Sequence, residues 1–308
     1  MNQETKICQN CKRDFIIEID DFNFYEKIKV PPPTFCPECR TIRRFLWRNE
    51  RALYKRSCNA PGHTEEIISM YSPDVPGIIF DQKYWWTDGW DPLQYGKEYN
   101  FNVPFLAQFK ELMEQTPLSA LQNVNSTNSE WCNPAVDNKN CYLSFAATKN
   151  ENANYCDRIA NCQDSLDLYV GNKTELSYSS LFIENCTKVH FSMHVRNCID
   201  SYFLYDCNNC SDCIGCVNLR NKQFHIFNQP YTKEEYQKEK EKLALGTFEG
   251  LKKLQKKFQE FRSSLPCRHA HMINTVNSTG DNLENVKNAR FCFDILNGME
   301  NSKYCIWG

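Results

Sequence analysis

The sequence predicts a mainly β protein, in which a small cysteine-rich module and a basic helix precede a repetitive parallel coil with a helical insertion. Three observations predict this fold class. Two Cys-x-x-Cys pairs lie before residue 40, Asn-Cys pairs recur from residue 140 onward, and a charged segment with helical spacing interrupts the repeat. We divide the chain accordingly into a cysteine module with a basic helix (1–63), an aromatic linker region with one helix (64–122), the repeats (123–228), a helical insertion (229–262) and a return of the repeats (263–308).

The composition narrows the class of protein. The 308 residues include 18 cysteines, too small a share for a small disulfide scaffold. The net charge of −2 excludes a general attraction to polyanions but not a local basic patch. The N-terminus has no apolar run, so we expect no signal peptide, and no apolar stretch approaches the ~18 residues of a membrane span. We therefore expect reduced thiols, a cytoplasmic protein and no membrane partner.

Four cysteines form the two Cys-x-x-Cys pairs, Cys8 with Cys11 and Cys36 with Cys39. Two thiolates separated by two residues can turn toward one ion, and two such pairs complete a closed tetrahedral sulfur site. The spacing predicts one structural zinc ion, because four thiolates leave no coordination position for a water. An iron centre and a pair of disulfides are the alternatives, and the expected cytoplasmic location weighs against disulfides.

This region resembles a zinc-ribbon domain of small bacterial proteins. The resemblance covers about the first 45 residues and is carried by the segments Cys8 to Phe15, Asp21 to Lys27 and Pro31 to Arg40. It implies Cys8, Cys11, Cys36 and Cys39 as zinc ligands. The whole chain also resembles Cys-rich zinc-ribbon proteins of candidate-phylum bacteria, in which a Trp-Arg-Asn-Glu-Arg segment follows the ribbon, here Trp47 to Arg51. That group implies no established activity.

A basic run follows the ribbon. It comprises Arg40, Arg43, Arg44, Trp47, Arg48, Arg51, Lys55 and Arg56. Its apolar residues interleave with the charges at helical spacing, so we expect an amphipathic helix with an arginine face. Arginine forks match phosphate geometry, and Trp47 and Tyr54 could stack on bases. The sequence thus favours contact with nucleic acid or a ribonucleoprotein, while pairing of these arginines with the acidic remainder of the chain is the alternative.

The Asn/Cys region repeats. Asn140-Cys141, Asn161-Cys162, Asn185-Cys186 and Asn209-Cys210 recur at intervals of 21, 24 and 24 residues. This spacing predicts an Asn/Cys-rich parallel β-solenoid, similar to a right-handed β-helix, with one turn per ~22 residues. Asparagine suits the corners because it tolerates left-handed φ and can hydrogen-bond its own ladder, and cysteine suits the interior because it is small and apolar.

The segment 263–308 matches this coil. Val124-Asn125-Ser126-Thr127 recurs as Val276-Asn277-Ser278-Thr279. We expect the segment to rejoin the same coil after a helical insertion. Because the sequence ends without a capping segment, we expect an end that is covered by another subunit or that self-associates, or else a truncated chain.

Two helical regions are indicated. Pro104 precedes Phe105, Phe109, Leu112 and Met113 at helical spacing. Thr232 with Glu235 forms a capping-box pattern, and a second segment begins after Gly246. We expect the apolar face of each helix to pack on the protein's own body, and a partner-binding helix is the alternative.

Other clusters have weaker signals. Cys207, Cys210, Cys213 and Cys216 form a Cys-x-x-Cys-x-x-Cys-x-x-Cys run, which predicts buried thiols first, and a second zinc or an iron–sulfur cluster as alternatives. Cys58 and His63 have the spacing of half a metal site, and we expect structural roles for them. The aromatic run Tyr84 to Asp91 and the pair His190 and His194 are candidates for catalysis, and packing is the more economical explanation.

These patterns favour a zinc-binding protein whose basic helix contacts nucleic acid and whose solenoid is a rigid platform. A protein–protein interaction scaffold is the alternative, and a carbohydrate-active β-helix enzyme is a weaker one. No nucleophile elbow, phosphate loop or dinucleotide fingerprint is present in the sequence. We therefore name no catalytic residue.

Overall fold

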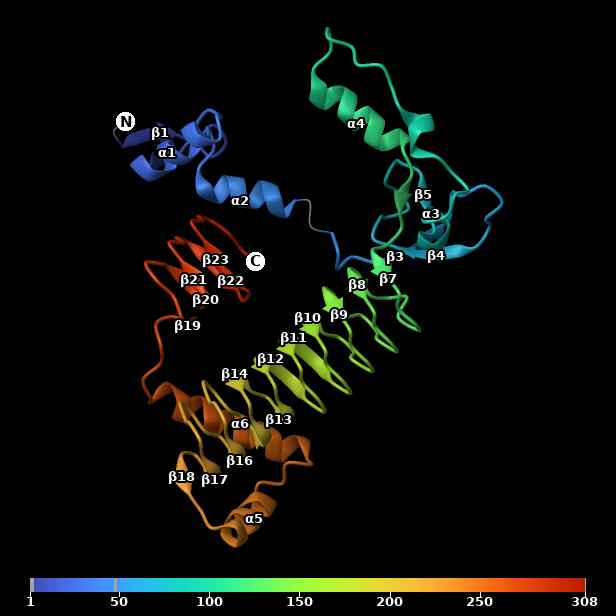
Figure 1. The fold of residues 1–308 in the computed structure, drawn as a ribbon. Coiled ribbons are helices and arrows are strands. Elements are labelled where there is room, and N and C mark those ends of the chain that lie inside the picture. The colour runs from blue at the N-terminus through green and yellow to red at the C-terminus, as the bar shows by residue number, and fades with distance from the viewer. Residues whose placement is uncertain (1–2, 47–48, 308) are drawn as a thin grey trace. The chain divides into compact units, whose positions relative to one another are not determined.

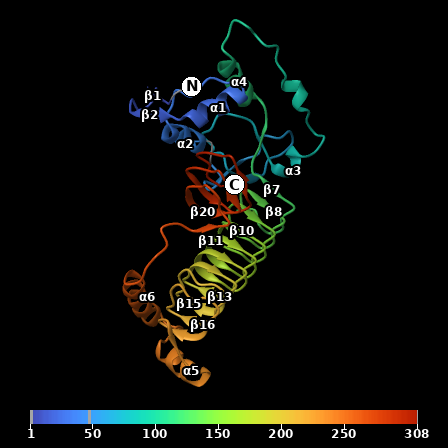
Figure 2. The same ribbon diagram turned by 60° about the vertical axis from the view of Figure 1, so that its left-hand side comes forward.

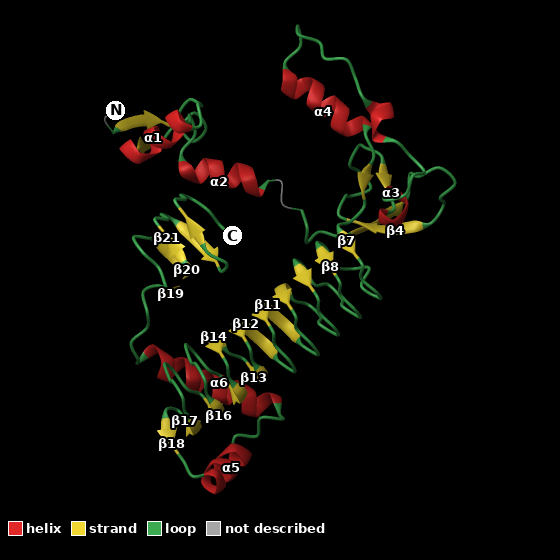
Figure 3. Cartoon of the chain, viewed as in Figure 1, coloured by secondary structure: helices red, strands yellow, loops and turns green. Residues whose placement is uncertain are grey.

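The computed structural model describes residues 3–46 and 49–307. The chain forms two compact units, one of Met1–Asn49 with Pro266–Gly308 and the other of Glu50–Leu265 (Figure 1). Strands hold 32% of the residues and helices 21%, so the prediction of a mainly β protein is confirmed (Figure 3). Among the described helices, none combines the length and the apolar character needed to cross a bilayer.

The N-terminal part of the first unit is a hairpin followed by two helices. β1 (Glu4–Ile7) pairs antiparallel with β2 (Asp14–Ile17), and α1 (Ile19–Lys27) and α2 (Pro37–Phe45) follow. The Asp21 carboxylate accepts the backbone N–H of Glu18 and so satisfies a free donor at the start of α1. Phe15, Ile17 and Phe22 pack on the buried cysteines of this segment, which supplies its small core.

The C-terminal part of the first unit is a short set of parallel strands. β19 (Met272–Ile273), β20 (Gly280–Glu284) and β22 (Cys292–Ile295) form one sheet, and β21 (Val286–Lys287) and β23 (Met299–Glu300) form another. Its core residues are three apart in sequence: Leu283, Val286, Ala289, Cys292 and Ile295. We call residues 271–307 the C-terminal coil. Its strands pair with each other and form sheets separate from the 12-stranded sheet of the second unit.

The last residues of the C-terminal coil lie against α1 and α2 of its own unit. Lys303 Nζ is 2.8 Å from Glu18 Oε2 and 3.0 Å from Asp21 Oδ1. The guanidinium of Arg40 lies 5.5 Å from the ring centre of Tyr304, and the rings of Phe45 and Trp307 meet edge to face at 5.6 Å. The N-terminal segment of the same chain therefore covers the last turn of this coil.

The second unit begins with a small module of mixed elements. These are β3 (Tyr54–Ser57), β4 (Glu66–Ser69), β5 (Ile79–Phe80), α3 (Gln82–Trp85), a 3₁₀ helix η1 (Pro92–Tyr95), α4 (Phe105–Gln115) and β6 (Leu118–Ser119). β3 and β4 form an antiparallel hairpin, and β5 pairs parallel with β6. The core of this module contains Cys58, Ile67, Ile79 and Phe80.

A sheet of 12 strands follows, and all of its pairings but one are parallel. Its strands are β7 (Asn123–Val124), β8 (Ala135–Val136), β9 (Ala147–Thr148), β10 (Asp157–Ala160), β11 (Leu166–Asn172), β12 (Tyr178–Glu184), β13 (Thr187–His190), β14 (Met193–Arg196), β15 (Ile199–Tyr202), β16 (Ser211–Ile214), β17 (Gln223–Ile226) and β18 (Gln229–Pro230). Both ribbon views show the strands stacked in a row from β7 toward β17 (Figures 1 and 2), and β13 and β14 both pair with β12. We call β7 to β17 the ladder.

Residues that pair between neighbouring parallel strands of the ladder are 12 positions apart in the sequence. The same interval separates asparagine side chains that are hydrogen-bonded between neighbouring strands. Ala135 pairs with Ala147, Leu166 with Tyr178, and Ile199 with Ser211. The predicted turn of ~22 residues is therefore wrong. Asn185-Cys186 and Asn209-Cys210 mark every second repeat, while Asn140-Cys141 and Asn161-Cys162 are three positions short of two repeats.

Within each repeat the backbone follows a period of three. Asn185, Lys188, Phe191, His194 and Asn197 all have positive φ, between 50° and 55°. The residue after each is buried: Cys186, Val189, Ser192, Val195 and Cys198. A left-handed residue at every third position bends the chain, so four triplets make up one repeat and one side chain per triplet points inward.

Asparagine ladders stabilise some of these corners, as the sequence predicts. Asn140 Nδ2 donates to Asn152 Oδ1 at 3.2 Å, and Asn185 Nδ2 donates to Asn197 Oδ1 at the same distance. Because each amide both donates and accepts, the bond repeats from one strand to the next. Asparagine also tolerates the left-handed conformation better than most residues do.

The helical insertion covers the end of the ladder. α5 (Lys233–Lys242) begins at the predicted capping box of Thr232 and Glu235, and α6 (Phe248–Ser263) follows Gly246. Tyr236, Leu254 and Phe258 are buried against ladder side chains, so the prediction that this region packs on the protein's own body is confirmed. β18 pairs antiparallel with β17 and so occupies the backbone groups of the last parallel strand.

A side chain, and not a strand, lies on the opposite edge of the ladder. At β7, the side-chain amide of Gln82 donates to the carbonyl of Asn123 and accepts its N–H, as the backbone of another strand would. The helix predicted after Pro104 is present as α4. Its apolar residues Phe105 and Phe109 are 57% and 44% exposed, whereas Leu112 and Met113 are half-buried. The prediction that this face packs on the protein's own body is therefore wrong for its first half.

The backbone period leads to a stability prediction at Val170. Val170 has φ of 56°, a conformation that costs a β-branched residue roughly 1–2 kcal/mol. Val170→Asn should raise the free energy of unfolding by about 1 kcal/mol, because asparagine tolerates this conformation. Val136→Asn is the matched control at an exposed strand position with ordinary φ and should give no gain. Thermal unfolding of both variants measures the effect, and equal shifts would contradict the strain argument.

Candidate metal centre

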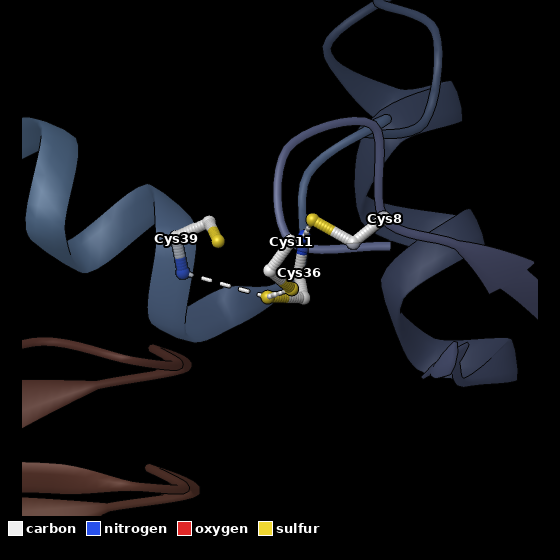
Figure 4. Close-up of side chains that lie close together, drawn as sticks. All are labelled: Cys8, Cys11, Cys36 and Cys39. Atoms are coloured by element: carbon white, nitrogen blue, oxygen red, sulfur yellow. Dashed lines mark hydrogen bonds between the residues drawn. The ribbon is translucent and has the colours of Figure 1, made fainter. Parts of the chain in front are cut away.

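The β1–β2 hairpin and α2 bring four cysteines together. Cys8 directly follows β1, and Cys11 lies in the turn before β2. Cys36 is the residue before α2, and Cys39 lies in the first turn of that helix after Pro37. Proline suits this position because its missing N–H has no helical partner there. The two Cys-x-x-Cys pairs thus come from a hairpin turn and a helix start (Figure 4).

The four sulfurs form a compact group. All four Sγ atoms lie within 4.8 Å of one another, and Cys11 Sγ is 3.8 Å from Cys36 Sγ. The backbone N–H of Cys36 donates to Cys8 Sγ at 3.3 Å, and Asn10 Nδ2 donates to Cys39 Sγ at 3.3 Å. Cys8, Cys36 and Cys39 are buried. Donors that point at sulfur stabilise the thiolate form, which is the form that binds a metal.

The proton affinities of these thiols differ. Burial raises the pKa of Cys8, but the backbone N–H groups of Cys36, Cys11 and Asn10 outweigh it and lower the pKa to about 6. Burial raises the pKa of Cys36 to about 11. One thiolate therefore forms readily near neutral pH, and a second one beside it would repel the first unless a cation lay between them.

This donor set fits a metal ion such as zinc. Four closely spaced sulfurs with N–H donors match a closed site of four thiolates, in which the ion would hold the hairpin to α2. Such a site leaves no open position for a water, so the chemistry it supplies is structural. Cys8, Cys11, Cys36 and Cys39, which the sequence singles out, are the residues that the structure brings together. We call them the four-cysteine group.

The basic run does not form one helix. α2 ends at Phe45, and Arg51, Lys55 and Arg56 belong to the other unit, where Lys55 and Arg56 lie on strand β3. Trp47 and Arg48 lie outside the described residues. The predicted helix is therefore wrong for the second half of the run. Lys55 and Arg56 lie in a strand instead, because β3 pairs antiparallel with β4.

Most of the described basic side chains have partners within the protein. On α2, Arg40 donates to the Tyr25 hydroxyl at 3.1 Å, and Arg44 donates to the carbonyl of Tyr304 at 3.2 Å. In the other unit, Arg51 pairs with Asp157, Lys55 with Glu66, and Arg56 with the carbonyl of Ser72. The guanidinium of Arg43 lies 4.5 Å from the ring centre of Phe35 and is exposed.

The Cys207 run lies inside the ladder. Cys207, Cys210, Cys213 and Cys216 are each buried and occupy the inward position of four successive triplets. Cys207 Sγ is 3.5 Å from the carbonyl oxygens of Tyr205 and Cys216. The neighbouring Cys210 thiol and burial raise the pKa of Cys207 and of Cys213. Within the described chain, this set is not among the groups whose ligand atoms all lie within 4.8 Å of one another.

The candidates for catalysis lie in packed surroundings. Trp85 Nε1 donates to the carbonyl of Pro117 at 3.4 Å, and Trp90 Nε1 donates to the carbonyl of Trp85 at 2.9 Å. Asp91 caps η1 through the N–H of Leu93. His190 contacts the ring of Tyr202, and burial lowers the pKa of His190. These contacts agree with packing and capping roles.

The structure also gathers a group that includes a residue missed by the sequence analysis. Cys58, His63 and Glu65 each offer a ligand atom within 4.8 Å of the other two. Glu65 does not belong to any Cys/His pair with the spacing of a metal half-site, so the sequence pattern alone does not single it out. The alternation of His63 and Glu65 just before a strand was the available signal, since residues two apart point to one side of an extended segment.

Removal of one ribbon cysteine tests the first site. Cys39→Ser should lower the zinc content by one ion per chain, because three thiolates no longer complete the closed site. Cys267→Ser is the matched control, since Cys267 is an exposed cysteine in the same unit, and should leave the metal content unchanged. Elemental analysis of the purified variants gives the result. Equal zinc in Cys39→Ser and the wild type would show that the group binds no ion.

Comparison of the chain with models of protein families and with curated proteins finds no match. The likeness to a zinc ribbon therefore rests on the four cysteines and their geometry.

Proposed function

We propose that the protein is a zinc-structured β-solenoid scaffold without a catalytic role, which presents its ladder to a protein partner. The observation that carries this proposal is the docking of the ribbon on the C-terminal coil, through Lys303, Tyr304 and Trp307. A metal in the four-cysteine group would set the angle between the β1–β2 hairpin and α2. It would thereby hold both ribbon helices in place over the last turn of the coil.

The pairing interval supports the solenoid part of the proposal. A strand that pairs in parallel with the segment one repeat later has room for a coil turn but not for a crossover helix. One inward side chain per triplet gives each turn four core residues, which is enough to fill a narrow coil. The right-handed sense expected from the sequence belongs to the same proposal, because parallel crossovers are almost always right-handed.

An uncovered apolar column on the ladder favours a protein partner. Tyr142, Leu166 and Tyr178 are 42%, 36% and 37% exposed and lie in one column of parallel partners, in which the polar Asn154 stands between Tyr142 and Leu166. The same column continues to Tyr202 and Ile214, which pack in the cluster formed with α5 and α6. The packing of α5 and α6 on the second half of the column supports an apolar helix face as the partner for the first half.

All 18 cysteines are free thiols in the structure, and most of them are buried. Such thiols persist in a reducing compartment, which supports the proposal that the protein is cytoplasmic.

Nucleic-acid contact is the second candidate. Arg43 and Arg44 are both exposed on the last turn of α2, where guanidinium groups could reach phosphate. The remaining described members of the basic run contact acidic, aromatic or carbonyl groups of the protein, and they are divided between two units. We therefore rank the scaffold first.

Hydrogen exchange tests the docking on which the scaffold depends. Cys39→Ser should speed amide exchange of residues 290–307 by about tenfold or more, because loss of the ribbon removes the partners of Lys303 and Tyr304, and ~1.4 kcal/mol corresponds to a factor of ten. Exchange of residues 135–226 should not change. Mass spectrometry of peptides from both regions measures this effect.

Lys303→Gln is the companion variant. It breaks the contact to Glu18 and Asp21 without touching a thiol, so it should speed exchange in the coil while the zinc content stays at the wild-type value. If exchange in the coil stays slow in both variants, the ribbon does not hold the coil and the proposal fails.

A binding assay tests the second candidate. Arg43→Glu should weaken binding to a fluorescent single-stranded RNA and reduce the slope of log affinity against log salt by about one, as expected for one lost phosphate contact. Lys256→Glu on α6 makes the same change of charge at an exposed site and should have a smaller effect. Equal affinities of the two variants, or absence of binding by the wild type, would exclude this role for α2.

A further inference from the structure

The β3–β4 hairpin repeats the layout of the hairpin that carries the first two cysteines of the four-cysteine group. Cys8 directly follows β1, and Cys58 directly follows β3. The N–H of Cys8 donates at 2.9 Å to the carbonyl of Arg13, the last residue before β2. The N–H of Cys58 donates at 3.3 Å to the carbonyl of Glu65, the last residue before β4. Each cysteine therefore closes the loop of its hairpin.

The correspondence extends to the helix after each hairpin. Cys36 precedes α2, and its N–H donates to Cys8 Sγ at 3.3 Å. Asp81 precedes α3, and its N–H donates to Cys58 Sγ at 3.2 Å. Cys58 Sγ also accepts the N–H of Ala60 at 3.4 Å. Two backbone donors thus point at the buried sulfur of Cys58, as donors do at sulfurs of the first site, and this arrangement suits a sulfur ligand.

The loop between β3 and β4 supplies two more ligand types at the same point. Gly62 has φ of 78°, a left-handed turn that suits glycine, and the N–H of His63 donates to the carbonyl of Ala60. The turn brings His63 Nδ1 to 2.5 Å from Glu65 Oε1. The ring of Tyr84 packs edge to face on the imidazole, with ring centres 4.8 Å apart, and limits its orientation.

We propose that Cys58, His63 and Glu65 bind a second zinc ion, in a site of ribbon layout whose fourth coordination position is open. One thiolate, one imidazole and one carboxylate are zinc ligands, and with three protein ligands a four-coordinate ion keeps a place for water or another ligand. Asp81 Oδ2 accepts the N–H groups of Lys83 and Tyr84 at the start of α3, so this carboxylate has another use.

The burial of the three ligands indicates how such an ion would behave. Cys58 is 6% exposed, whereas the side chains of His63 and Glu65 are 27% and 50% exposed. The ion would therefore bind the buried sulfur of Cys58 on one side and would be accessible to solvent on the side of His63 and Glu65. It would exchange with chelators faster than an ion enclosed by the four thiolates of the ribbon. This second site goes beyond the proposed scaffold function and does not depend on it.

Metal analysis of the full chain tests the second site. After saturation with zinc and removal of the excess, the wild type should hold two ions per chain and His63→Asn one. His269→Asn, which changes an exposed histidine elsewhere, should hold two. Glu65→Gln changes an exposed side chain, so it should fold normally even if His63→Asn does not. It should lose the same zinc ion. We avoid Cys58→Ser for this count because Cys58 belongs to the core of its module.

Cobalt separates the two sites by their ligands. In Cys39→Ser, the remaining Co²⁺ should show thiolate-to-metal charge transfer about a quarter as strong as that of an ion with four thiolates, because one thiolate binds in place of four. Addition of a chromogenic chelator should release this ion first from the wild type. One zinc per chain in the wild type overturns the inference. Two in the wild type with no loss in His63→Asn also overturns it, because the second ion then lies elsewhere.

Discussion

A left-handed residue at every third position is the constraint on which the ladder depends. In the segment from Asn185 to Asn197, every third residue has positive φ, whichever side chain it carries. Asparagine is one of the few side chains that tolerate this conformation well. Bulky residues such as Phe191 and His194 accept the same conformation, so tertiary packing must outweigh the local cost. Burial of the following residue and pairing with the next strand supply that compensation. This three-residue period determines which side chains point inward, which aromatic side chains form columns, and which surface packs against α6.

The same constraint divides the cysteines into two chemical kinds. Inside the ladder many thiols donate to main-chain carbonyls. The neighbouring thiols lower the pKa of Cys210 and Cys216, whereas burial raises the pKa of Cys156 and Cys186. Such thiols are inert and fill small inward positions. At the ribbon, backbone N–H groups point at sulfur, and four sulfurs converge. Convergence of four sulfurs, rather than burial alone, distinguishes the candidate metal site from core cysteines.

The N-terminal segment that carries the four-cysteine group also contacts the C-terminal coil. Lys303 reaches two carboxylates, Glu18 and Asp21, and the interaction with Lys303 lowers the pKa of Glu18. Because a lowered carboxyl pKa contributes stability above its unfolded value and loses it as pH falls through the folded value, this contact weakens in acid. Protons compete for the thiolates in the same direction. Both parts of the contact therefore favour neutral conditions over acidic ones.

Local chemistry determined much of what the sequence alone could predict. The four-cysteine donor set, the capping box at Thr232 and the asparagine corners depend on residue types whose spacing is visible in one dimension. The tertiary structure decided the rest. Strand pairing sets the 12-residue interval of the ladder and places Arg56 in a strand instead of the predicted helix. The contact between Glu18 and Lys303 joins residues that are 285 positions apart in the sequence. Such partners are selected by packing of the whole chain, which no local pattern specifies.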